Sequence, residues 1–390
     1  MTRDFWSRFS LSVFACVGIA FCAFFASFFV LLFGGARFYV SLVVLAAVLL
    51  ALNLVIVIFG WFARRTRVLT ALGCVLLCLA AAGYYEAKEA YIDGLGSVDE
   101  REVNLHEYQP FANPTKAVRL DEPASYRIGS ELPRLDGATA LYPLYAAFVQ
   151  AVYPANTYEP YDEKAGPVVC SSTTEAYRRL ISGEADIIFA AAPSYAQSKL
   201  AKNKGVELKL TPIGREAFVF FVNRKNPVDG LTTRQIKDIY GGKATNWKDV
   251  GGADGHIRAF QRNPDSGSQT RLEQIMAGET LMTPPHEDVT SMMAGIIRET
   301  SSYRNYKNAL GFSFLFYASE MNRSNKIKLL SIDGIAPSAE TIRSGEYPYV
   351  TEFYAVTAGS ANPNIQPFLD WILSPQGQKL VEQTGYVAIR

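Results

Sequence analysis

Three long apolar runs in the first quarter of the chain restrict its fold more than any other feature. Leu11 to Phe33 carries no charged side chain, and uncharged runs follow from Phe38 to Ala63 and from Val68 to Tyr85. A helix needs about 20 apolar residues to cross a bilayer. The apolar part of a signal peptide has only about 7–15, and two further runs would not follow it. The sequence therefore predicts a membrane domain of three transmembrane helices at residues 1–85, of which the third is the shortest.

The positions of the cations predict the orientation of these helices. Arg3 and Arg8 precede the first run, and Arg64, Arg65 and Arg67 lie between the second and the third. The turn between the first two runs holds a single arginine. Because cytoplasmic loops carry the excess of Lys and Arg, the N-terminus is expected in the cytoplasm. We therefore expect a multi-pass protein of the cytoplasmic membrane, in contact with the lipid bilayer, with everything after residue 85 outside the cytoplasm.

Composition argues against several classes of function. The net charge of +1 gives no reason to expect a nucleic-acid partner. Cys170 is the only cysteine outside the apolar runs, so no disulfide framework is expected there. The 3 histidines lie outside the turns described below. We therefore predict no catalytic residues, no metal site and no cofactor, and a hydrolase is the less favoured alternative.

The remainder of the chain divides into a linker and an α/β region. Residues 86–126 are polar and interrupted by proline, which predicts a linker. Beyond them, short apolar segments alternate with helical patterns, as is typical of α/β folds with largely parallel sheets. The expected strands are Val168–Cys170, Asp186–Ala190, Ala217–Val222 and Ile257–Phe260, and the expected helices are Thr173–Ser182, Thr233–Tyr240 and Gln269–Ala277.

Three segments share one local pattern, in which a strand leads through small or hydroxylated residues into a helix. They are Leu135–Ala140, Val169–Glu175 and Arg262–Gln269. In the second, Ser172 and Glu175 have the spacing of a capping box. The first N–H groups of a helix have no internal partner and carry about half a positive charge. Each turn alone is typical of an ordinary helix cap, whereas three that converge would bind an oxyanion.

At these residues the outer region resembles the phosphate-binding proteins of ABC transporters, a branch of the type II periplasmic-binding fold. The resemblance covers roughly residues 127–390, and no single motif decides it. Its marks, in chain order, are Gly137-Ala138-Thr139, Ser171-Ser172, Ala185-Asp186-Ile187, the segment from Leu231 to Trp247, Arg262 with Asp265-Ser266-Gly267-Ser268, and the region Trp371–Tyr386.

The resemblance implies a fold, a function and a site. The fold would have two lobes, the first at about 127–212 and 352–390 and the second at about 213–351. The function would be binding of inorganic phosphate or a similar oxyanion for an ABC transporter permease. The anion would be held by Thr139, the N–H of Ala140, Ser171, Arg262, Ser266, Gly267 and Ser268. Asp265 would orient Arg262, and Ser172 would support the second turn.

The chain departs from the family pattern at one position. The family's phosphate binders usually carry an aspartate where this chain has Ala191, and that carboxylate accepts a hydrogen bond from a protonated phosphate oxygen. Glu175, Glu216 or Asp265 would be the alternative acceptors, or the ligand would be a different anion. A membrane-bound sensor or structural ectodomain without phosphate specificity is therefore the second hypothesis. Arg215 and Glu216 are expected to form a structural ion pair near the hinge between the lobes.

Overall fold

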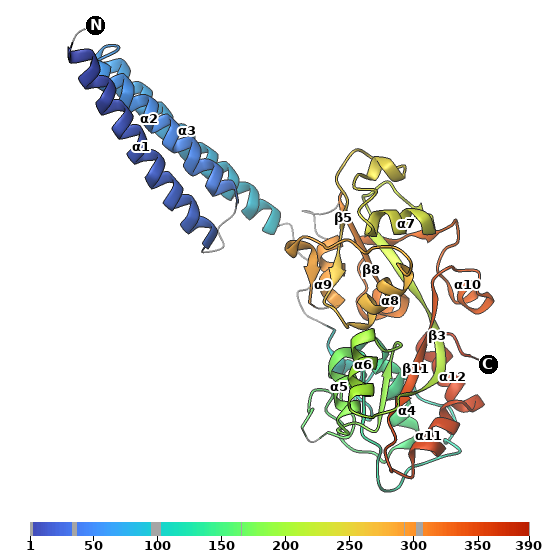
Figure 1. Ribbon diagram of the computed structural model, residues 1–390. Coiled ribbons are helices and arrows are strands. Elements are labelled where there is room, and N and C mark those ends of the chain that lie inside the picture. Colours follow the sequence, from blue (N-terminus) through green and yellow to red (C-terminus); the bar gives the residue numbers. More distant parts are fainter. Residues whose placement is uncertain are drawn as a thin grey trace. The chain divides into compact units, whose positions relative to one another are not determined.

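The computed structural model describes residues 3–32, 37–94, 103–164, 166–291, 293–301 and 307–389. The chain divides into two compact units, Met1–Leu95 and Gly96–Arg390. The first unit is helical and the second is a mixed α/β structure (Figure 1).

The first unit consists of three long helices, α1 (Arg3–Leu32), α2 (Arg37–Phe59) and α3 (Arg64–Gly94). Each contains an apolar stretch long enough to cross a membrane, at Asp4–Val30, Phe38–Phe59 and Arg64–Ala87. The third apolar run, the shortest in sequence, thus lies in a helix with a stretch of 24 residues. All three expected helices are present.

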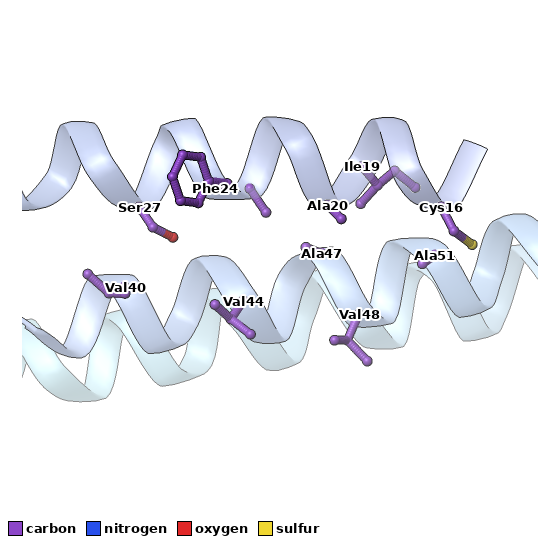
Figure 2. A pocket seen from close by; sticks show the side chains of 11 residues that line it. Cys16, Ile19, Ala20, Phe24, Ser27, Val40, Val44, Ala47, Val48 and Ala51 are labelled. Carbon is purple, nitrogen blue, oxygen red and sulfur yellow. The ribbon is translucent and has the colours of Figure 1, made fainter. Parts of the chain in front are cut away.

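Small and polar side chains lie between these helices. Between α1 and α2 is an apolar groove of about 440 Å³, where Ala20 of α1 faces Ala47 of α2 and Cys16 faces Ala51 (Figure 2). Small residues let helices approach closely in a bilayer. Between α2 and α3, the amide of Asn53 donates to Cys74 Sγ at 3.4 Å and accepts from the Thr70 hydroxyl at 3.3 Å. These contacts fix the register of α3 against α2.

The second unit contains short strands and helices in alternation. Its strands are β1 (Leu135–Gly137), β2 (Ile187–Ala190), β3 (Lys209–Asn223), β4 (Gly230–Leu231), β5 (Arg258–Ala259), β6 (Gln261–Arg262), β7 (Val289–Thr290), β8 (Ala309–Phe314), β9 (Ile327–Leu329), β10 (Ser331–Ile332) and β11 (Val350–Thr357). Its α-helices are α4 (Tyr142–Val152), α5 (Thr173–Ile181), α6 (Tyr195–Asn203), α7 (Thr233–Tyr240), α8 (Gly267–Ile275), α9 (Met293–Ser301), α10 (Ala339–Ser344), α11 (Ile365–Ile372) and α12 (Pro375–Thr384). Short turns of helix occur at η1 (Leu105–Tyr108), η2 (Thr139–Leu141), η3 (Trp247–Val250), η4 (His286–Asp288) and η6 (Tyr317–Met321).

The main sheet has the strand order β1-β2-β11-β3-β8-β5, with β9 also paired to β3. The pairs β1–β2 and β5–β8 are parallel, whereas β11 runs antiparallel to β2 and β3, and β3 runs antiparallel to β8 and β9. The expectation of largely parallel sheets was therefore wrong. The reason is that β3 and β11 run in opposite directions through the centre of the sheet, and each pairs with neighbours on both sides.

Two hydrophobic cores lie at the two ends of β3. One gathers residues of α4, β1, β2, α11 and α12, and the other gathers β8, α7, α8 and the second half of β3. The first half of β3 pairs with β11, and its second half, from Phe218, pairs with β8. Within the first half, a Cβ on Gly214 would lie 2.3 Å from the ring of its pairing partner Phe353, so β3 and β11 can approach this closely only with glycine here. The lobe boundaries near residues 212 and 352 stay a proposal, which these cores support.

Much of the expected linker at residues 86–126 belongs to neighbouring parts of the structure. Helix α3 continues to Gly94. From η1 onward the chain packs against the first lobe, where Leu105, Tyr108 and Ala117 are buried in its core. Apolar side chains spaced among the prolines provide this contact, so the second half of the stretch belongs to the folded lobe.

Glu216 does not form the structural ion pair expected with Arg215. Adjacent residues of a strand point to opposite faces of the sheet, so the two side chains diverge. Glu216 is buried, and its carboxyl accepts the N–H of Phe316 at 2.7 Å. Burial raises the pKa of Glu216 to about 8, against the opposing effect of this hydrogen bond.

Candidate functional site

The first turn of the candidate site directly follows β1. A Cβ on Gly137 would lie 2.5 Å from the carbonyl oxygen of Phe189, so the close pairing of β1 with β2 requires glycine. Thr139 and Ala140 then form the short helix η2, in which Thr139 is half-buried and Ala140 is buried. The Tyr386 hydroxyl donates to the carbonyl of Ala140 and fixes this turn to the C-terminal segment.

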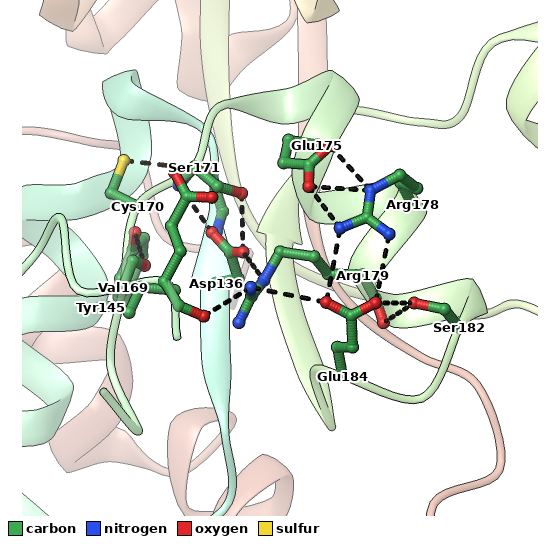
Figure 3. A network of polar contacts seen from close by, with 12 residues as sticks. Asp136, Tyr145, Val169, Cys170, Ser171, Glu175, Arg178, Arg179, Ser182 and Glu184 are labelled. Carbon is green, nitrogen blue, oxygen red and sulfur yellow. Dashed lines mark hydrogen bonds and ion pairs between the residues drawn. The ribbon is translucent and has the colours of Figure 1, made fainter. Parts of the chain in front are cut away.

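The Asp136 carboxylate is the centre of a buried network beside this turn (Figure 3). The N–H and the hydroxyl of Ser171 both donate to it, at 2.8 Å and 2.7 Å. The N–H of Gly137 donates at 2.7 Å, and Nε of Arg179 lies 2.9 Å away. All of these groups are donors, as an ionised carboxylate requires. Asp136 therefore holds Ser171 in one orientation and engages both of its donors.

Burial and the neighbouring polar groups shift the pKa values of two residues in this network. Burial raises the pKa of Asp136, while the hydrogen bonds from Ser171 and Gly137 and the charge of Arg179 act in the opposite sense. Burial also raises the pKa of the Cys170 thiol to about 12, and a hydrogen bond with Tyr145 partly offsets this. Cys170 is therefore a neutral thiol at physiological pH, which argues against a nucleophilic role. Its thiol donates to the carbonyl of Gly137 at 3.6 Å, which links the end of β1 to the loop that carries Ser171.

The predicted capping box of Ser172 with Glu175 is wrong. Ser172 is the N-cap of α5, but its side chain makes no capping hydrogen bond. Its φ of +80° lies outside the extended region in which a serine side chain reaches the first helical N–H groups. Glu175 bonds instead to Arg178 on the helix surface, with Nε to Oε1 at 2.8 Å. Gly183 lies just beyond the end of α5 with a φ of +77°, the left-handed conformation in which glycine commonly closes a helix.

The second lobe contributes the turn between β6 and α8. Ser266 is the N-cap of α8, and its hydroxyl oxygen accepts from the N–H of Gln269. Gln269 also accepts from the N–H of Arg262 at 2.9 Å, which fixes β6 to the start of the helix. The first N–H groups of α8, at Gly267 and Ser268, therefore point out of the helix end. Both residues are buried.

Arg262 extends alongside this helix end. One guanidinium nitrogen donates to the carbonyl of Ser291 at 2.9 Å, and the other makes a long contact of 3.5 Å with the hydroxyl of Ser268. The guanidinium is half-buried beside the first turn of α8. A fixed cation next to outward N–H groups is suited to an oxyanion.

Asp265 connects the second lobe to the first. Its carboxylate accepts the hydroxyl of Ser194 at 2.7 Å. Its carbonyl accepts from Gln197 at 3.0 Å and from the Thr174 hydroxyl at 3.2 Å. Asp265 has a φ of +65°, so it, like Ser172 across the cleft, keeps a conformation unusual for a residue with a side chain. These contacts join the turn before α8 to α5 and α6, and the orienting of Arg262 by Asp265 stays a prediction.

The two halves of the candidate site face each other at Gly267. A Cβ placed there would lie 3.1 Å from the Thr173 hydroxyl and 3.7 Å from the Ala191 side chain, both on the first lobe. The structure thus brings the start of α8 up to the start of α5, two residues after Ser171. Sequence reasoning missed Thr173, Ser194 and Asp136. Of these three, only Asp136 had a signal in the sequence, because it is an aspartate within a strand that was expected to be buried.

The carboxylates named as substitutes for the aspartate that Ala191 replaces are occupied elsewhere. Glu175 pairs with Arg178, Glu216 accepts from Phe316, and Asp265 accepts from Ser194. Ser171 remains as a candidate acceptor, because the oxygen of a hydroxyl that donates to Asp136 still has lone pairs. Among the described residues, no group of three or more His, Cys, Asp or Glu side chains is placed to hold a metal ion.

The fold and the opposed helix ends define a two-lobed ligand-binding protein of the type II periplasmic-binding kind. Residues 130–376 match the family model described as a PBP superfamily domain. The chain therefore belongs to the PBP superfamily.

Individual relatives are similar over the same region. The phosphate-binding protein PstS of Bacillus subtilis is 26% identical over 260 residues, which are 65% of this chain and 80% of the relative. PstS of Staphylococcus epidermidis is 26% identical over 229 residues, 56% of this chain and 68% of the relative. The structure of a candidate phosphate ABC transporter substrate-binding protein from Clostridium perfringens, with bound phosphate, has a TM-score of 0.52 at 22% identity. That match covers 66% of this chain and 98% of the other, and it shows the shared fold.

Proposed function

We propose that this protein is a membrane-anchored extracytoplasmic solute-binding protein for phosphate or a related oxyanion, which serves ABC-type uptake. The observation that carries the proposal is the close approach of the α8 N-terminus to Thr173 of the opposite lobe, with Arg262 alongside. Outward N–H groups and a guanidinium together offer donors to an anion. The relatives named above are phosphate-binding proteins, which supports binding and not catalysis.

The anion site would use donors from both lobes. Thr139 and the N–H of Ala140 would act from the first lobe, and Arg262, Ser266, Gly267 and Ser268 from the second. Ser171 would act differently, because both of its donors are engaged by Asp136. Its lone pairs would accept the P–OH hydrogen of hydrogen phosphate, and so replace the acceptor that Ala191 lacks. Sulfate has no such hydrogen and would leave Ser171 facing another acceptor, which costs binding energy.

Ligand binding tests this function directly. Phosphate at 100 times its Kd is expected to raise the free energy of unfolding by about 2.7 kcal/mol, and sulfate at the same concentration by much less. Ser171→Ala is expected to reduce the phosphate-to-sulfate affinity ratio about tenfold, because it removes the acceptor. Thermal unfolding and calorimetric titration measure both effects. Ser198→Ala, at an exposed serine of α6, is the matched control. Equal binding of both anions, or binding of neither, would contradict the proposal.

The three apolar helices would anchor the binding domain as a multi-pass segment. Arg8 and the cluster Arg64, Arg65 and Arg67 support a cytoplasmic N-terminus and a cytoplasmic α2–α3 turn. Alkaline phosphatase, which is active only outside the cytoplasm, tests this. A fusion after Gly94 is expected to be active and a fusion after Trp61 inactive. The reverse pattern would invert the topology, and inactivity of both fusions would remove the third span.

A further inference from the structure

A small cavity adjoins the proposed anion site on the side of the strands that join the lobes. It has a volume of about 160 Å³. Its walls include Ala191 and Gly267, which also border the anion site, together with Thr270, Arg271, Glu352 and Tyr354. The cavity therefore adjoins the position that an anion at the start of α8 would occupy. From there it extends along the next turn of that helix.

The polar groups of this cavity are incompletely paired. Thr270 is only 5% exposed, and its hydroxyl has no hydrogen-bond partner among the described residues. Arg271 donates to Gln274 at 3.2 Å and to the carbonyl of Val350 at 3.1 Å, while its buried Nε has no hydrogen-bond partner in the described part of the chain. Buried polar groups left without partners are rare in folded proteins, and such groups around a cavity indicate that something polar fills it.

The charges of the cavity restrict what that occupant is. Arg271 offers donors, and burial lowers its pKa. Glu352 offers an acceptor, since its carboxylate receives only the Tyr354 hydroxyl, at 3.2 Å, among the hydrogen bonds described for it. Arg271 and Glu352 form no ion pair with each other in the described part of the chain. A group that both accepts from Arg271 and donates to Glu352 satisfies both without adding net charge, and hydroxyl groups do this.

We propose that the protein binds monophosphate esters of short polyols, with the phosphoryl group at the α8 N-terminus and the polyol in the cavity beside it. The proposal rests on the function proposed above. The volume corresponds to about five water molecules at about 30 Å³ each, which accommodates a three-carbon polyol. Ala191 presents only a methyl group where the ester oxygen would leave the site, and the remaining P–OH of the monoanion would pair with Ser171.

Two esters with the same phosphoryl group isolate the contribution of the polyol. We expect glycerol 3-phosphate to bind the full-length protein in detergent at least tenfold more tightly than ethyl phosphate, at pH 6, where a substantial fraction of each ester is the monoanion. A charge-assisted hydrogen bond accounts for about this factor. Calorimetric titrations with both esters, and with inorganic phosphate, give the ratios.

Variants test whether the cavity is responsible. Arg271→Gln and Glu352→Gln are each expected to bring the ratio of the two ester affinities close to one, and Thr270→Val, which keeps the shape of the side chain, to lower it about threefold. Arg323→Gln removes an exposed arginine of the same lobe and is expected to leave the ratio unchanged. Phosphate binding with equal affinities for the two esters would overturn the cavity proposal alone. Failure of phosphate and both esters to bind would overturn the proposed function as well.

Discussion

Arg262→Ala is expected to raise the Kd for phosphate at least about 100-fold. The guanidinium lies beside the first turn of α8, where it contacts Ser291 and Ser268. Its removal takes away a permanent charge and up to two charge-assisted hydrogen bonds to the ligand, each worth about 1.5–3 kcal/mol. A loss of about 2.7 kcal/mol already corresponds to 100-fold. Isothermal titration of the purified chain measures the change.

The control for this variant is Arg323→Ala. Arg323 belongs to the same lobe, is 71% exposed and pairs with Glu320 at the surface. We expect its removal to leave phosphate affinity unchanged. The melting temperature without ligand shows whether Arg262→Ala remains folded, because Arg262 also holds β6 against the loop at Ser291. A folded variant that binds phosphate within threefold of the original protein would remove Arg262 from the site.

Glu216→Gln is expected to change how stability depends on pH. Burial raises the pKa of Glu216 from 4.5 to about 8. Between these values the folded protein keeps a proton that the unfolded chain has lost, so this residue makes the free energy of unfolding fall as pH rises from about 4.5 to 8. Glutamine stays neutral, and its carbonyl can still accept from Phe316. The variant should match the original at pH 4.5 and exceed it at pH 8 by up to about 5 kcal/mol.

Denaturant unfolding of the second unit, Gly96–Arg390, between pH 4.5 and 9 measures this difference. Glu346→Gln removes a glutamate at an exposed position and is the matched control. Its stability curve should run parallel to that of the original protein. A Glu216→Gln curve that is also parallel over this range would show that Glu216 ionises normally in the folded state.

Local sequence signals predicted much of the architecture. Apolar runs of sufficient length predict α1, α2 and α3, because a single segment can satisfy its own backbone hydrogen bonds in a membrane by forming a helix. The expected helices Thr173–Ser182 and Gln269–Ala277 correspond to α5 and α8, whose ends are marked locally by the positive φ of Gly183 and the capping hydroxyl of Ser266. The start of α8 was predicted to within two residues for this reason.

Contacts between distant parts of the chain could not be predicted in this way. Asp136 and Ser171 are 35 residues apart, and Asp265 and Ser194 are 71 apart, so no local pattern links them. The same limit explains the error about the sheet, because β3 and β11 pair in antiparallel fashion through residues that lie 133 to 148 positions apart in the sequence. At Ser172 the local pattern was misleading, since a capping serine needs an extended backbone and this one has a positive φ.

The most direct test is a crystal structure of the protein with arsenate, a phosphate analogue that anomalous scattering locates. We expect one arsenic peak between the lobes. Its oxygens should lie about 3 Å from the N–H groups of Gly267 and Ser268 and from the Arg262 guanidinium, with Ser171 and Thr139 on the opposite side. A cleft without arsenate, or a peak confined to the outer surface of one lobe, would contradict the account.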